Sequence, residues 1–275
     1  MSRDWQVYYY WDDLPGSSMP GYISLCLESW SRHSKADSIV RINLDNVESI
    51  TGGALTARQL QLFTPAQRSD ATMAAIMSSR RGLFMDADTV LLPSFDPDRY
   101  MMKDKPSFYA KFAKGFAEPL LAFGASPHHD RRFTSRWVTE TLRAIRREDR
   151  SWARRARRLL RTCLGKTAHV KWDYLGARIL DPLAFDSQTR WAAEFIDAKS
   201  SGFLPGAGDE GYGPASVNAY WLGAGSDQLF SPAVYPHGIV ALQNSWLPTA
   251  IKAMSRREVL SHPSRLGRLL NYVIG

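Results

Sequence analysis

The sequence predicts an α/β fold with a mainly parallel sheet flanked by helices, because strand-like and helix-like segments alternate along its first third. The strand-like segments are short and apolar or aromatic, whereas the helix-like segments place apolar residues three and four positions apart. Such an alternation is typical of parallel sheets, whose crossover connections are helical. In order, the segments are strand 7–11, helix 21–33, strand 38–44, helices 55–63 and 69–80, and a strand whose apolar residues are 83–85.

The last of these strands runs directly into two aspartates, Asp86 and Asp88. Residues two apart on a strand face the same side, so the two carboxylates can point together. Carboxylates at such close range repel one another, and a divalent cation relieves that repulsion. Oxygen ligands of this kind suit Mg²⁺ or Mn²⁺, which take phosphate oxygens as further ligands. The pair indicates a metal–diphosphate site, although an acidic turn is the simpler interpretation of these two residues alone.

Trp11 ends the first predicted strand and is expected to lie near the aspartate pair. Ligands of parallel sheets bind beyond the carboxyl ends of the strands, which is where Trp11, Asp86 and Asp88 all fall. Without further information, Trp11 is also compatible with an ordinary core position.

The chain has 275 residues and two cysteines, Cys26 and Cys163, which lie far apart in the sequence. The N-terminus shows no apolar stretch after a basic start, and no apolar run approaches the ~20 residues that span a bilayer. We therefore expect reduced thiols and a cytoplasmic protein, whose membrane contact, if any, is peripheral on the inner face of the cell membrane.

The net charge of +8 comes from one segment. Thirteen basic and three acidic residues lie between Arg131 and Lys166, so this segment carries +10 and the rest of the chain about −2. Apolar spacing predicts one long helix over 136–163. Its arginines either form a solvated helix face or attract an anionic membrane surface. No aromatic platform or nucleic-acid motif accompanies them, so no nucleic acid is expected as a partner.

The remainder of the chain completes a single expected domain, 1–275. Residues 108–123 form strands or a helix, 200–214 a glycine-rich loop containing Asp209 and Glu210, and 235–246 a strand-like run. The domain's expected parts are residues 1–95, residues 96–250 and a C-terminal helical segment at 251–275.

Several motifs occur together in the order found in one known family. They are the aromatic strand ending in Trp11, a Met-Pro helix ending in Ser29-Trp30, Ser69-Asp70, and Gly-x-x-x-Asp-x-Asp ending at Asp88. This combination resembles the DxD-type glycosyltransferases of bacterial capsular polysaccharide synthesis. These are related to the initiating mannosyltransferases of yeast and to the catalytic domain of clostridial glucosylating toxins. The resemblance is clear over residues 5–95 and looser in Asp173-Tyr174-Leu175-Gly176, Gly213-Pro214 and Asn244-Ser245-Trp246.

The resemblance implies a GT-A fold, with a Rossmann-like nucleotide-sugar-binding half at 1–95 and an acceptor and closing half at 96–250. It also implies a retaining transfer of a sugar from a nucleotide-sugar donor to a glycan or lipid-linked acceptor, with Mn²⁺ or Mg²⁺ as cofactor. Trp11 corresponds to the residue that stacks on the nucleobase, and Asp70 to the carboxylate that binds sugar or ribose hydroxyls. The implied catalytic residues are Asp70, Asp86 and Asp88, the implied metal ligands are Asp86, Asp88 and Ser245, and the implied donor-binding residues are Trp11, Asp70, Asp86, Asn244, Ser245 and Trp246.

The chain departs from the family pattern at Met73, where the family commonly has an arginine that touches the donor. Arg68, Arg80 or Arg81 are candidates to replace it. His237 is a candidate additional metal ligand. The family often has a metal-binding histidine late in the chain, and His237 is not in register with it. The adjacent pair His128-His129 is expected to be exposed and is not taken as a metal site.

Two alternatives to a working transferase remain. A degenerate transferase fold that only binds partners would explain Met73. A phosphatase of the haloacid dehalogenase type has a motif similar to residues 83–89, but it requires a threonine four residues after its first aspartate, and Thr89 follows Asp86 by three. Asp70 has its own simpler interpretation as a helix N-cap, worth ~1 kcal/mol.

Overall fold

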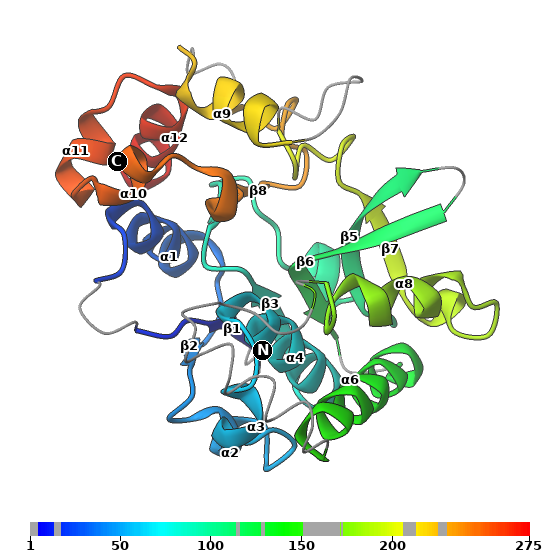
Figure 1. The fold of residues 1–275 in the computed structure, drawn as a ribbon. Coiled ribbons are helices and arrows are strands. Elements are labelled where there is room, and N and C mark those ends of the chain that lie inside the picture. Colours follow the sequence, from blue (N-terminus) through cyan, green and yellow to red (C-terminus); the bar gives the residue numbers. More distant parts are fainter. Residues whose placement is uncertain are drawn as a thin grey trace.

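The computed structural model describes residues 5–13, 18–113, 116–127, 130–150, 171, 173–205, 213–224 and 230–275. A six-stranded sheet with the order β2-β1-β3-β6-β5-β7 lies at its centre (Figure 1). The strands of this sheet are β1 Gln6–Tyr10, β2 Ile39–Ile42, β3 Gly82–Met85, β5 Ser107–Ala113, β6 Phe116–Ser126 and β7 Glu194–Asp197.

The sheet is mixed. Strand β1 pairs in parallel with both β2 and β3, and β5 pairs in parallel with β7, whereas β6 runs antiparallel to both of its neighbours. The expected α/β class is therefore confirmed, with three of the five strand pairings parallel, and the arrangement is compatible with a Rossmann-like fold.

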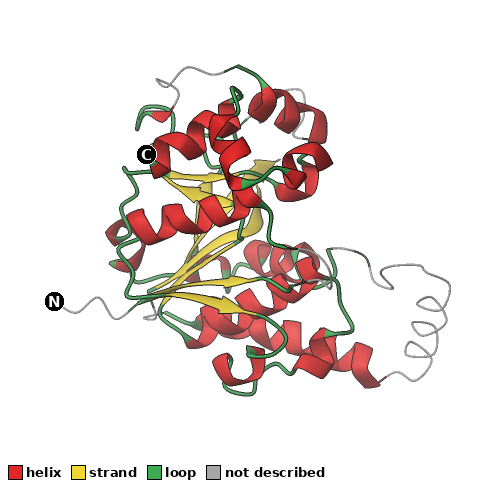
Figure 2. Cartoon of the chain, turned by 90° about the vertical axis from the view of Figure 1, so that its left-hand side faces the viewer, coloured by secondary structure: helices red, strands yellow, loops and turns green. Residues whose placement is uncertain are grey.

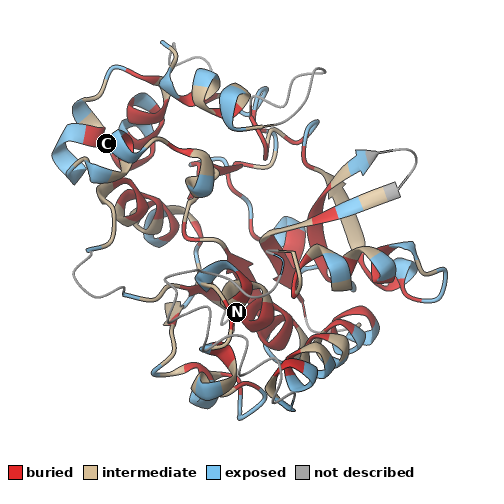
Figure 3. Ribbon diagram, viewed as in Figure 1, coloured by how far each residue is buried: buried red, intermediate tan, exposed pale blue. Residues whose placement is uncertain are grey.

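Helices cover both faces of the sheet (Figure 2). Residues alternate between the two faces along β1: Val7 and Tyr9 belong to one apolar cluster, whereas Tyr8 and Tyr10 belong to the other. This alternation follows from the two-residue period of a strand. Figure 3 shows that β1 and β3 are almost entirely buried.

The remaining described elements surround this sheet. A second, two-stranded antiparallel sheet joins β4 Thr89–Leu91 to β8 Ile239–Ala241. The helices are α1 Gly21–His33, α2 Val47–Ile50, α3 Ala57–Leu60, α4 Pro65–Ser79, α5 Asp98–Met101, α6 Arg132–Arg150, α8 Ala177–Phe185, α9 Pro214–Leu222, α10 Thr249–Ala253, α11 Arg256–Ser261 and α12 Arg265–Ile274, with 3-10 turns η1 Arg190–Ala192 and η3 Asn244–Trp246. None of the helices in the described ranges combines the length and the apolar character needed to cross a membrane.

The structure decides or revises two sequence-based assignments and describes only part of a third. The undecided segment 108–123 forms strands β5 and β6. Helix α4 begins earlier than expected, because Thr64 caps it in a capping box with Gln67, so Asp70 lies inside the helix and is not its N-cap. Helix α6 is described to Arg150, and the rest of the predicted helix 136–163 lies outside the described residues.

Candidate functional site

The adjacent parallel strands β1 and β3 deliver the predicted residues to the same edge of the sheet. Tyr8 of β1 lies opposite Phe84 of β3, so the chain beyond both strands leaves at their carboxyl ends. Trp11 follows β1 there, and its backbone N–H donates to the carbonyl of Ile42, 2.9 Å away. The Trp11 side chain is partly buried against the apolar cluster that contains Tyr9.

A tight turn holds the aspartate pair between β3 and β4. The Asp86 N–H donates to the Ala122 carbonyl, and the Thr89 N–H donates to the Asp86 carbonyl, both at 2.9 Å. The Asp88 carbonyl accepts from the Leu242 N–H at 3.0 Å. The turn is therefore fixed on one side by β6 and on the other by the segment after β8.

The electrostatics of the aspartate pair are those of poorly solvated carboxylates. Burial, followed by the negative charge of Asp88, raises the pKa of Asp86 to about 8, and a hydrogen bond from the Ser69 hydroxyl at 3.3 Å partly opposes this. The pKa of Asp88 is also raised, mainly by burial, and is lowered in part by backbone hydrogen bonds and by the positive charge of Lys252. A cation beside the two ionised side chains would compensate both charges.

Asp70 belongs to the same group of acids. It projects from α4, and burial followed by the charge of Asp86 raises its pKa well above its usual value. A side chain on Gly176, just before α8, would place its Cβ only 2.7 Å from Asp70 Oδ2 and 2.6 Å from Leu121 Cδ1. The absence of a side chain at Gly176 therefore lets the start of α8 pack directly against Asp70.

Asn244 closes the site from the C-terminal part of the chain. Its backbone N–H donates a hydrogen bond to Asp88 Oδ2, and its side-chain oxygen accepts one from the Tyr22 hydroxyl. Gln243, which precedes it, adopts a left-handed backbone conformation with φ 59° and turns the chain toward Asp88. Trp246 is partly buried against the apolar cluster, whereas Ser245 is exposed, with no hydrogen bond from its hydroxyl to Asp86 or Asp88 among the described residues.

The remaining candidate residues either lie away from the aspartate turn or fall outside the described residues. His237 precedes β8, whereas Asp88 contacts the residue that follows β8, so the two lie at opposite ends of this strand. The Nδ1 atom of His237 is instead 3.1 Å from the Tyr100 hydroxyl. Arg80 follows α4 and donates to the Ile50 carbonyl at 3.1 Å, and Arg81 directly precedes β3, so both lie at the end of β3 opposite to Asp86. His128, His129, Asp209 and Glu210 lie outside the described residues.

Arg68 is the one candidate replacement for the family arginine that lies at the site's edge of the sheet. Its Nη1 is 2.7 Å from Asp12 Oδ2, one residue after Trp11, and its Nε donates to the carbonyls of Leu60 and Phe63 at 3.1 and 2.9 Å. These contacts orient Arg68 firmly. Met73 itself is fully buried and packs against Gly124 on the sheet.

Sequence reasoning missed two residues of this site. Tyr22 reaches Asn244 across 222 positions, and Lys252 acts on Asp88 from α10. The Met-Pro start of α1 was a usable signal for Tyr22, since that motif already belonged to the family pattern. No local pattern distinguishes Lys252.

Asp86 and Asp88 are compatible with a Mg²⁺ or Mn²⁺ site in which the protein provides only two of the ligands. Within the described residues, no cluster of three or more His, Cys, Asp or Glu side chains is arranged to hold a metal ion. Mg²⁺ is commonly bound through one or two carboxylates together with water and substrate phosphates, and Asp86 and Asp88 are the two carboxylates that could hold it here. Comparison of the chain with models of protein families and with curated proteins gives no match.

Proposed function

We propose that this protein is a metal-dependent retaining glycosyltransferase of the GT-A type. It moves a sugar from a nucleotide-sugar donor to a glycan or lipid-linked acceptor in bacterial capsular or surface polysaccharide synthesis, on the cytoplasmic side of the membrane. The observation that carries the proposal is the convergence of Asp70, Asp86 and Asp88 at the edge of the sheet where Trp11 leaves β1. The motif order in the sequence, which resembles that family, supports the same assignment.

The residues divide the work by their chemistry. Asp86 and Asp88 hold the cation, which neutralises the charge that develops on the leaving diphosphate. Trp11 offers a flat apolar surface for a nucleobase. Asp70, held between α4 and Gly176, accepts hydrogen bonds from donor hydroxyls and so orients the sugar. The Asn244 N–H donates to Oδ2 of Asp88 and so orients this carboxylate toward the cation.

Donor hydrolysis with Mn²⁺ tests the proposal. Wild type is expected to release nucleoside diphosphate from a nucleotide sugar, and Asp88→Asn is expected to lose this activity. Asp45→Asn is the matched control, because Asp45 is an exposed aspartate on the loop after β2. Equal hydrolysis by wild type and Asp88→Asn would refute the assigned role.

A degenerate fold without catalysis is less well supported. The observation that suggests such a fold is Met73 in place of an arginine. The Met73 side chain packs in the core, where it contributes to stability. Burial of Met73 in the apolar core therefore accounts for the departure from the pattern at this position without a loss of catalysis.

A further inference from the structure

Three exposed aromatic side chains gather at one end of the molecule. Seven large apolar side chains are exposed in the described residues, and four of them are aromatic. Three of these four, Phe112, Phe185 and Trp191, line a single recess of about 210 Å³. Their exposed fractions are 53%, 41% and 66%. Such clustering marks an interaction surface, whereas single exposed apolar residues are ordinary.

This surface is built from three separate parts of the chain. Phe112 comes from the outer end of β5, Phe185 from the last residue of α8, and Trp191 from η1. Strand β5 and helix α8 lie together on the right-hand side of Figure 1, and η1 contributes Trp191 to the same recess. No sequence pattern connects them, since they come from three segments that are far apart in the chain.

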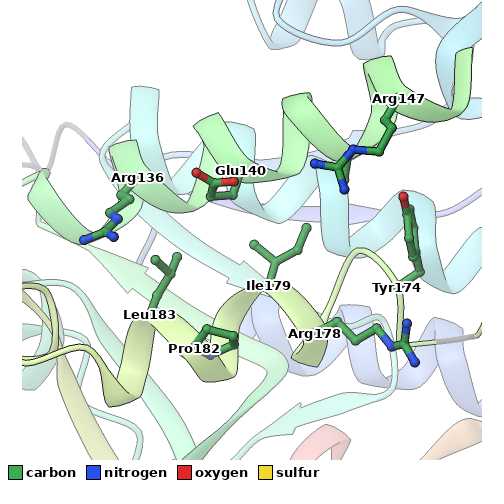
Figure 4. Close-up of a pocket in the computed structure, with 9 residues that line it drawn as sticks. Arg136, Glu140, Arg147, Tyr174, Arg178, Ile179, Pro182 and Leu183 are labelled. Atoms are coloured by element: carbon green, nitrogen blue, oxygen red, sulfur yellow. The ribbon is translucent and has the colours of Figure 1, made fainter. Parts of the chain in front are cut away.

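Basic residues adjoin the aromatic side chains. The Arg190 guanidinium lies 4.8 Å from the centre of the Trp191 ring. On the other side of α8, a groove of about 350 Å³ separates α8 from α6, and Arg136, Arg147 and Arg178 surround it (Figure 4). The basic α6 therefore adds positive charge to this end of the molecule.

Part of that charge is neutralised within the protein. Arg136 forms an ion pair with Asp186, and Arg178 forms one with Asp173. The positive charge of these two arginines is therefore balanced by the paired aspartates. Both arginine side chains are still about half exposed, at 46%. They can therefore exchange these exposed ion pairs for contacts with an external anion, because exposed pairs stabilise the fold only weakly.

We propose that this end of the molecule docks on an anionic phospholipid surface. Phe112, Phe185 and Trp191 enter the headgroup layer, where aromatic rings are favoured, and Arg190 contacts lipid phosphates together with the arginines of α6. A lipid surface fits better than a protein partner, because the patch combines aromatic rings with a basic surround and the rest of the chain carries a slight negative charge.

The position of α8 connects this surface to the candidate site. Helix α8 starts directly after Gly176, which lies against Asp70, and ends at Phe185 in the aromatic patch. Its nine residues span about 14 Å at 1.5 Å per residue. A membrane bound at Phe185 would therefore present a lipid-borne acceptor close to Asp70. This last step rests on the proposed function, whereas the docking itself does not.

Co-sedimentation of the full chain with vesicles, without any donor, tests the docking alone. Vesicles of equal parts phosphatidylcholine and phosphatidylglycerol are expected to bind the protein about tenfold or more tightly than vesicles of phosphatidylcholine. The double variant Phe112→Ser/Trp191→Ser is expected to lose about tenfold in affinity, and Arg190→Gln about fivefold. Met102→Ser and Arg257→Gln, both exposed on other surfaces, are the matched controls and are expected to bind like wild type.

Fluorescence gives a second readout that does not depend on loss of binding. Trp191 is expected to shift its emission to shorter wavelength on vesicles, and Trp191→Phe is expected to lack that shift. Equal binding to both vesicle types, or an unchanged affinity of the double variant, would overturn the proposal. So would a concentration-dependent dimer in sedimentation velocity that the double variant abolishes, because the patch would then join two copies of the chain. Vesicle binding without donor hydrolysis would leave the docking intact and reject only the transferase.

Discussion

The backbone N–H of Asn244 donates a hydrogen bond to the carboxylate of Asp88, which lies 156 positions earlier in the chain. The Tyr22 hydroxyl in turn donates to the side chain of Asn244. These two contacts connect the start of α1, the aspartate turn and the C-terminal part of the chain. The orientation of Asp88 therefore depends on residues that are distant in the sequence.

The first prediction concerns pH without added metal. The folded-state pKa of Asp86 is raised to about 8, whereas an unfolded aspartate titrates near 4. Between these values the folded state binds more protons than the unfolded state, so stability falls as the pH rises through this window. Melting temperature measured from about pH 5 to 8 is expected to decrease from this contribution.

The variant Asp86→Asn isolates that effect. It is expected to melt at a higher temperature than wild type at pH 8 and to show a flatter pH profile, because the buried charge is gone. Some slope remains, since burial also raises the pKa values of Asp70 and Asp88. A profile identical to that of wild type would show that Asp86 is well solvated in the folded protein.

The second prediction is that Gly176→Ala weakens the site. The new Cβ would meet Asp70 Oδ2 at 2.7 Å, so either Asp70 or the start of α8 must move. Overpacking of this kind costs about 1–3 kcal/mol of stability. Nucleotide-sugar affinity, measured by titration calorimetry, is expected to fall more than the affinity for the nucleoside diphosphate alone, because Asp70 is assigned to the sugar.

Gly213→Ala is the control for Gly176→Ala. Gly213 stands directly before α9 and has an extended backbone with φ −161°. Among the described residues, no atom lies within 4 Å of the position that an added methyl group would take there. This variant is expected to behave like wild type in both titrations. Equal nucleotide-sugar affinities in the Gly176 variant and this control would show that packing at Gly176 does not affect how Asp70 binds the donor.

The third prediction is that Met73 cannot be converted to arginine, the residue common at this position in the family that the sequence resembles, without loss of stability. Met73 is fully buried, and its Cε lies against Gly124 of β6. An arginine here would bury an unpaired charge, at a cost on the order of 3–5 kcal/mol. Met73→Leu keeps the volume and is expected to cost less than about 1.5 kcal/mol. Urea denaturation of both variants measures the difference, and a stable, more active arginine variant would contradict this account.

The local part of the site was predictable from the sequence. Asp86, Asp88 and Trp11 stand directly after short apolar or aromatic strands, and neighbouring parallel strands bring such ends together. Asp70 was harder, because its place next to Ser69 suggested a cap, although Thr64 and Gln67 carried a readable capping box.

The rest depended on long-range packing. Strand β6 lies between β3 and β5, and its core-facing residues on both sides remove the simple alternation that identifies a strand. Pro119 and Gly124 within it weaken the strand signal further. The contact between Tyr22 and Asn244 joins residues 222 positions apart, and no local spacing encodes it.

The central claim is that Asp86 and Asp88 hold a cation that carries a donor's diphosphate. It is tested most directly by thermal shift with a nucleoside diphosphate, with and without Mn²⁺, on wild type and Asp88→Asn. A ligand that binds only the folded state raises the melting temperature by mass action. The account predicts a shift for wild type that requires both Mn²⁺ and the nucleotide and is lost in Asp88→Asn. A shift that is independent of Mn²⁺, or equal in the two proteins, would contradict it.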